Sequence, residues 1–197
     1  RFGLHAIKNV GSNAVEEILQ VREQLGGFKN LEEFFSNVNP RIVNRKSIES
    51  LIKSGAFDSL GERIQLLDNM ESLLGFSSKI QKEKEAGQTD LFGESDEVHT
   101  HVKLQLGPIT SDYTQHDQLA WERDLLGLYL SQHPLKAYQA YLEEKAVPLS
   151  ELKVEHDNKT VTVGWAIGEL REIVTKNGPK MVFAKLADEF AELELVV

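Results

Sequence analysis

The stretch LHAIKNVGSNAVEEI, residues 4–18, decides how the amino-terminal part of this chain folds. Its centre, Asn-Val-Gly at 9–11, is typical of a tight turn, because Asn and Gly accept left-handed backbone more readily than other residues. After the turn, apolar residues recur at 4-3-4 spacing: Ala14, Ile18, Val21 and Leu25. That period indicates a helix with one apolar face, and Gly26-Gly27 marks its end. The stretch therefore predicts two helical segments joined by a turn, with Val10 packed between them.

A turn of this kind can hold the backbone of DNA. Backbone N–H groups at the start of a helix, helped by the helix dipole, bind a phosphate without reading the base sequence. The residues expected to form this site are Lys8, Asn9, Gly11, Ser12 and Asn13. The stretch resembles the helix-hairpin-helix family, with Asn9 where that family usually has its first Gly. The alternative is a plain helical hairpin without a ligand.

Three more helices are predicted before residue 80. Asn30 with Glu33 forms a cap pair for the first, apolar residues at 48, 51 and 52 mark the second, and a capping box at 59–62 begins the third. A second hairpin fits residues 54–61. Its expected DNA contacts are Lys53, Gly55, Gly61 and Arg63. Two hairpins in tandem would grip both strands of a duplex.

The net charge of −9 limits how DNA can be bound. The first 80 residues are neutral overall, so the whole excess of acid lies in residues 81–197. Because bulk phosphate attraction needs a basic protein, any DNA contact here must be local. One local basic patch spans residues 41–53, where four cations face one carboxylate: Arg41, Arg45, Lys46 and Lys53, with Glu49. The alternative is a solvated helix face.

Periodicity is lost from Ser77 to about His116, which predicts a long loop or linker. It contains Gln88-Thr89-Asp90-Leu91-Phe92 between two glycines. This pentapeptide resembles the one by which bacterial proteins dock on the sliding clamp of the replisome. The resemblance implies that Leu91 and Phe92 enter an apolar pocket and that Gln88 hydrogen-bonds at its rim, with Asp90 beside them. The alternative is a Leu-Phe pair that pins the linker to the core.

The last part of the chain changes its period. A helix is predicted over 118–131, interrupted by His133-Pro134 and continued by apolar residues to 142. Strands are predicted over 160–167 and 191–197, and Asn177-Gly178 indicates a hairpin between two more. Because the chain ends within a strand pattern, we expect it to be a piece of a longer protein.

Joined in this order, the segments resemble the carboxy-terminal region of bacterial DNA polymerase III alpha subunits. The most specific matches after the clamp pentapeptide are LIKSGAFD (51–58) and LGLYLSQHPL (126–135). The resemblance implies an α+β protein with a tandem helix-hairpin-helix domain (1–80), a linker with the clamp peptide (81–117), a helical segment (118–146) and a truncated oligonucleotide-binding OB fold (147–197). It implies a noncatalytic fragment of a DNA-directed DNA polymerase, a nucleotidyltransferase, whose partners are duplex DNA, the clamp and, through the OB fold, single-stranded template.

Two other functions fit parts of the sequence. A hairpin-plus-OB segment of a DNA ligase would carry a Cys-type zinc site, but the chain has no Cys. An adaptor that binds DNA alone would not need Gln88, Leu91 and Phe92.

Several kinds of site are not expected. The acids Asp112, Asp117 and Asp124 are isolated, and His99 and His101 lack a third ligand, so we expect no catalytic residue, metal or cofactor. Trp165 and Phe183 could stack on bases, or pack in the core. The sequence has no apolar stretch long enough to cross a membrane and no signal segment, which favours a cytoplasmic protein.

Overall fold

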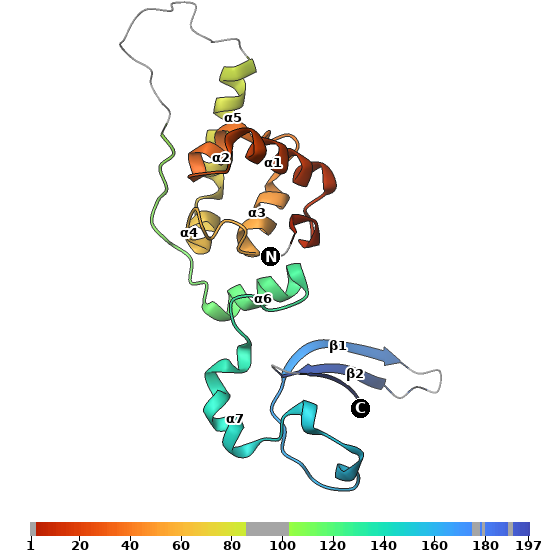
Figure 1. Cartoon of the computed structure of the whole chain (residues 1–197). Coiled ribbons are helices and arrows are strands. Elements are labelled where there is room, and N and C mark those ends of the chain that lie inside the picture. Colours follow the sequence, from red (N-terminus) through yellow and green to blue (C-terminus); the bar gives the residue numbers. More distant parts are fainter. Residues whose placement is uncertain (1–2, 86–102, 175–177, 179, 189–190) are drawn as a thin grey trace, which may run out of the picture. The chain divides into compact units, whose positions relative to one another are not determined.

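The computed structural model describes residues 3–85, 103–174, 178, 180–188 and 191–197. The chain divides into two compact units, Arg1–Tyr129 and Leu130–Val197. The predicted order, a mainly helical region followed by a β-rich region, is confirmed (Figure 1). The boundary at residue 129 divides the expected 118–146 segment, since its first helix belongs to the helical unit.

The helical unit begins with the short 3-10 helix Leu4–Ala6, followed by α1 (Ser12–Leu25), α2 (Leu31–Asn37) and α3 (Arg45–Lys53). Their apolar faces form one core, to which α2 contributes Phe34 and α3 contributes Leu51. Val10 and Phe57, from the two hairpins, belong to the same core. The predicted signals are confirmed at both ends of the α1–α2 connection. Gly26 ends α1 at φ 69°, and the side chain of Asn30 accepts the Glu33 N–H at the start of α2.

The helix predicted to start at a 59–62 capping box is two helices, α4 (Arg63–Asp68) and α5 (Met70–Glu85). The box prediction is wrong, because Glu62 is the N-cap of α4 and its side chain makes no capping hydrogen bond. The break falls at Asn69, whose side chain binds the N–H and carbonyl of Gly107 instead of solvent. The linker was also predicted to start too early, since α5 continues to Glu85.

Residues 103–113 form an extended strap along the helical unit rather than a free linker. Leu104 and Leu106 pack against the core. Polar groups fix the backbone after them: Gly107 binds Asn69, and Asp68 accepts the N–H groups of Thr110 and Ser111 at 2.6 and 2.9 Å. The strap leads into α6 (Gln115–Leu126), which starts with a capping box between Thr114 and Asp117. The helix predicted over 118–131 therefore starts earlier, at Gln115, and also ends earlier, where Gly127 follows it with φ 78°.

The second unit begins with the 3-10 helix Pro134–Tyr138 and α7 (Gln139–Lys145). Two single-turn 3-10 helices follow, Leu149–Glu151 and Val154–His156. The predicted break at His133-Pro134 is confirmed, and the His133 ring accepts the N–H of Leu135. The strand predicted over 160–167 is largely wrong, because pairing starts only at Ala166.

The sheet of the second unit is an antiparallel meander, β1-β2-β3. Its strands are β1 (Ala166–Val174), β2 (Lys180–Ala187) and β3 (Glu192–Val196). The predicted hairpin is confirmed by the β1–β2 register, in which Val174 faces Lys180, while Asn177 lies outside the described residues. β3 confirms the last predicted strand. The three antiparallel strands confirm the β-rich part that the sequence predicts, and the OB fold stays a prediction.

Candidate nucleic-acid interface

The first hairpin has the backbone geometry that the sequence predicts. Asn9 takes the left-handed conformation at φ 69°, so Asn does here what Gly does elsewhere. Val10 and Ile7 on either side of it are buried, 7% and 6% exposed. The turn therefore seats Val10 in the core and leaves Lys8, Asn9 and Gly11 at the surface.

The amino end of α1 is open to solvent. Gly11 is its N-cap, and no side chain caps the helix. The first backbone bond within the helix runs from Val15 N–H to the Gly11 carbonyl at 3.1 Å, which leaves the earlier N–H groups without a helical acceptor. Ser12 and Asn13 are exposed, and a Cβ on Gly11 would meet nothing within 4 Å. An oxyanion can therefore reach these donors from solvent.

Helix α3 holds the first hairpin in place. The Ser47 hydroxyl donates to the Asn9 carbonyl at 3.2 Å, and the Asn9 amide donates to the Ser50 hydroxyl at 3.3 Å. Lys46 is one position before Ser47 and one helical turn before Ser50, so it lies beside this contact. Its side chain is exposed and has no ion-pair partner in the described part of the chain. Sequence analysis placed Lys46 only in the broad 41–53 patch.

The second hairpin has a different role from the predicted one. Arg63 was expected on phosphate, but its side chain is 9% exposed and is held inside the unit. Its guanidinium makes two 2.7 Å hydrogen bonds to the Asp58 carboxylate and one of 2.8 Å to Glu122 Oε1. These bonds, first those to Asp58 and then that to Glu122, raise the pKa of Arg63 above its ordinary value. The prediction for Arg63 is corrected: it joins elements instead of facing solvent.

The glycines of the second hairpin serve packing. Gly55 has φ 82°, and a Cβ there would lie 2.2 Å from Arg63 Nη2. A Cβ on Gly61 would lie 3.1 Å from a methyl group of Leu66. Gly55 needs glycine because of its left-handed backbone, and an added Cβ at Gly61 would press on Leu66, so packing and backbone geometry account for both glycines without a phosphate.

The basic patch over 41–53 is mostly neutralised. Arg41 pairs with Glu85 at 3.0 Å, and Arg45 pairs with Glu71. Lys53 binds Glu49 at 2.5 Å, and its ammonium lies 5.4 Å from the ring centre of Trp121. The expectation of four cations against one carboxylate is therefore wrong, because folding brings two acids from α5 to this patch.

The predicted clamp peptide, with Gln88, Asp90, Leu91 and Phe92, lies outside the described residues, as do His99 and His101. The described residues on either side of it are both fastened to α2. Before the peptide, the Lys84 ammonium donates to the Ser36 carbonyl at 2.8 Å. After it, the Leu104 N–H donates to Glu32 Oε1 at 2.9 Å. Glu32 and Ser36 are one helical turn apart, about 6 Å along the axis.

The three acids considered as metal ligands have separate structural surroundings. Asp117 caps α6, Asp124 pairs with Lys8, and Asp112 is exposed. Within the described ranges, no group of three or more His, Cys, Asp or Glu side chains could hold a metal ion. In the same ranges, no helix is long and apolar enough to cross a membrane.

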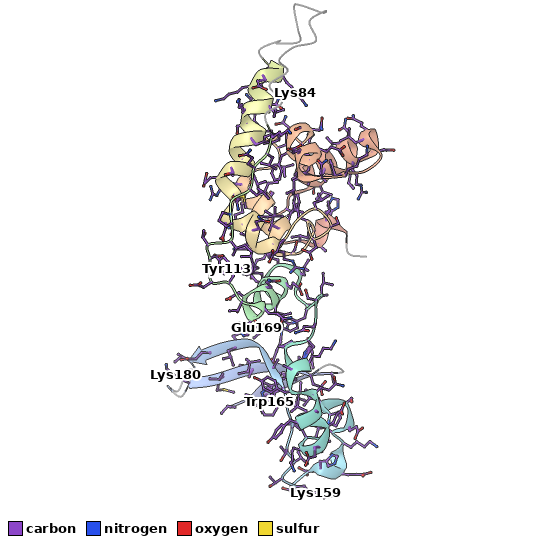
Figure 2. All side chains as sticks on the ribbon, turned by 90° about the vertical axis from the view of Figure 1, so that its left-hand side faces the viewer. Lys84, Tyr113, Lys159, Trp165, Glu169 and Lys180 are labelled. Carbon is purple, nitrogen blue, oxygen red and sulfur yellow. The ribbon has the colours of Figure 1, made fainter. Side chains whose placement is uncertain are left out.

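Sequence analysis missed the part of α6 that faces the hairpins. The Lys8 N–H donates to the Leu125 carbonyl, and the Lys8 ammonium lies 2.9 Å from Asp124. Tyr113, at the end of the strap (labelled in Figure 2), packs edge-on against Trp121. One signal was present: on the predicted helix, Glu122 shares a face with Leu119 and Leu125, three positions before and after it, and a carboxylate on an apolar face needs a buried cation.

The first hairpin has the geometry of a helix-hairpin-helix motif, and comparison with known proteins agrees. A family model described as "Helix-hairpin-helix motif" matches residues 1–66. Proteins named "DNA polymerase III subunit alpha" are similar along essentially the whole chain. The relative from Deinococcus radiodurans is 37% identical over 99% of this chain and 15% of its own length. Those from Haemophilus influenzae and Thermus aquaticus are 36% and 34% identical over 100% of this chain, and 17% and 16% of their own lengths.

The chain belongs to the family of DNA polymerase III alpha subunits, and it matches their carboxy-terminal region. It spans about a sixth of the length of the curated relatives. The resemblance that the sequence motifs indicated is therefore confirmed.

Proposed function

We propose that this chain is a noncatalytic part of a replicative DNA polymerase III alpha subunit, and that it holds duplex DNA and tethers the polymerase to the sliding clamp. The two contacts raise processivity together, because a tethered polymerase that releases DNA meets it again at a high effective concentration. The cytoplasmic location expected from the sequence belongs to this proposal.

The uncapped amino end of α1 carries the DNA half of the proposal. Its exposed N–H groups suit a phosphate oxygen, and Lys46 beside the hairpin supplies positive charge. Such a contact does not depend on base sequence. With a net charge of −9, the chain should bind duplex DNA weakly.

Replacing Ser12 tests this contact directly. Ser12 is the first residue of α1, where proline fits the helix, and Gly11 before it has ψ 159°, which proline accepts. S12P therefore removes one N–H donor with the helix intact. We expect weaker binding of a fluorescent random-sequence duplex in anisotropy titrations, while S12A, which keeps the N–H, binds as the parent does. Equal binding by S12P and S12A would remove α1 from the interface.

The clamp half of the proposal rests on the residues of 88–92 and on the way their neighbours are fastened. Gln88, Leu91 and Phe92 supply an amide and two apolar anchors, each anchor contributing roughly 1.5–3 kcal/mol when buried. Because the chain is held to α2 on both sides, the peptide joins the clamp to the helical unit that also holds the hairpin.

A surface-plasmon measurement with an immobilised bacterial clamp tests the clamp half. We expect the triple variant Q88A/L91A/F92A to lose binding, with its circular dichroism unchanged. T89A, at the position that the motif leaves open, is the matched control and should bind as the parent does. Undiminished binding by the triple variant would eliminate this peptide as the anchor.

The remaining expectations concern the second unit and catalysis. Trp165 and Phe183 are both partly exposed, so contact with single-stranded template through a completed OB fold stays part of the proposal. In this proposal, polymerisation belongs to other parts of the subunit.

A further inference from the structure

The three cations predicted as DNA contacts at the two hairpins all contact α6. Trp121 faces Lys53, Glu122 faces Arg63, and Asp124 faces Lys8. Lys8 belongs to the first hairpin, and the other two flank the second. Three positions within one turn of α6 therefore meet the basic side chains of both hairpins, and α6 lies beside α3 in Figure 1.

The two carboxylates differ in how easily they could be exchanged. Glu122 is fully buried, and Arg63 keeps only 9% of its side chain exposed. Separating that pair would leave a buried charge without compensation. Lys8 and Asp124 are 61% and 68% exposed, so water and ions reach both groups and a phosphate oxygen could take the place of the carboxylate.

We propose that α6 is an internal counter-anion for the tandem hairpins: Glu122 keeps the second hairpin closed to phosphate, and Asp124 competes with DNA for Lys8 at the first. This inference rests on the proposed function, because it presumes that the first hairpin holds DNA. In this proposal, Asp124 lowers the affinity of the chain for duplex DNA. Phosphate contact is confined to the first hairpin.

The surroundings of the second hairpin agree with this division. Two exposed charged side chains lie at this turn, Asp58 and Glu62, the residue before α4. Both are acidic. Lys53 is drawn toward Glu49 and Trp121. At the first hairpin, Asp124 is the one acidic residue that pairs with Lys8 in the described part of the chain.

The proposal predicts a distinctive salt dependence. When Lys8 moves from Asp124 to a phosphate, it neutralises DNA but frees a carboxylate, so little net charge is gained. Without the carboxylate, the same lysine contributes its full share, about 0.9 in the slope of log K against log salt.

The test uses the 197-residue chain and a fluorescein-labelled random-sequence duplex, with anisotropy titrations from low to physiological salt. We expect D124N to bind about two- to fivefold more tightly than the parent at low salt, the range of an exposed ion pair, and with a slope steeper by up to about 0.9. D112N changes net charge equally, but Asp112 has no ion pair among the described residues, so it should show neither effect. K8A should abolish the gain, so that K8A and K8A/D124N bind alike.

The outcomes separate this inference from the proposed function. If S12P and K8A weaken binding while D124N matches D112N, the hairpin holds DNA and Asp124 does not compete, which overturns the inference alone. If S12P and K8A both bind as the parent does, the DNA half of the proposed function fails and the inference fails with it. A gain in D124N that persists in K8A/D124N would also overturn it, since the gain would not pass through Lys8.

Discussion

Arg63 and Glu122, 59 positions apart in the sequence, form an ion pair at 2.8 Å in which the carboxylate is completely buried. The pair connects the second hairpin to α6 and so fixes the end of the strap. It also changes a residue that looked like a DNA contact into part of the core. The energetic consequences of this pair can be measured.

Removing the carboxylate should destabilise the helical unit. E122Q removes the charge of the buried carboxylate and leaves Asp58 as the remaining charged partner of Arg63 in the described residues, and we expect a loss of up to about 3 kcal/mol, the lower end for a broken buried pair. Urea unfolding followed by circular dichroism measures it. E71Q breaks the exposed pair with Arg45 and is the control, with little change expected. Equal losses in the two variants would mean that burial of the pair is unimportant.

Gly55 should not tolerate a methyl group. G55A places a Cβ at φ 82° and 2.2 Å from Arg63 Nη2, so we expect a loss of at least about 1–2 kcal/mol from backbone strain alone. Gly75 is the opposite case, within α5 and with nothing within 4 Å of an added Cβ. G75A should gain roughly 0.5–1 kcal/mol through helix propensity. Thermal unfolding of both variants tests the assignment, and a neutral G55A would contradict it.

Asn9 offers a test of the hairpin backbone. N9G and N9A both lose the hydrogen bond to Ser50, but only Ala is strained at φ 69°. N9A should therefore be about 1–2 kcal/mol less stable than N9G. The comparison uses chemical denaturation under identical conditions. Equal stability would show that the turn relaxes to another conformation in solution.

The strap should loosen in acid. The N–H groups of Thr110 and Ser111 donate to Asp68 and lower its pKa below the ordinary 3.8. A carboxyl group whose pKa is lowered by folding stabilises the folded state above its ordinary pKa and loses that contribution as the pH falls through the lowered one. Amide hydrogen exchange at Thr110 and Ser111 should therefore accelerate below about pH 3.8 relative to that of α1.

The control for this pH dependence is D68A, in which the two amides should exchange fast at every pH. Asp117 also has a lowered pKa, caused first by its bonds to Thr114. Its effect falls on the start of α6, so residue-level exchange separates it from that of Asp68. Protection of the strap amides that stays constant in acid would show that Asp68 does not hold them.

Local signals were sufficient for much of the fold. The Asn30–Glu33 cap, the Gly26 stop, the left-handed Asn9 and the β1–β2 hairpin each depend on residues close in sequence, so their chemistry could be seen in the linear chain. The break between α4 and α5 could not be predicted from the sequence because Asn69 and Asp68 bind a strap about 40 residues further on.

The amino-acid sequence by itself determined most of the order of helices, turns and strands, and the family, because these follow from neighbouring residues. The clamp peptide at 88–92 stays a prediction. Only the tertiary structure decided which cations face solvent. In the sequence, Lys8, Lys53 and Arg63 are three similar cations close to the hairpins. The long-range packing of α6 buries Arg63, places the ring of Trp121 near Lys53 and leaves Lys8 in an exposed ion pair. The interaction of a charged group depends on the groups that folding places within a few ångströms of it, and residues far apart in the sequence can come that close.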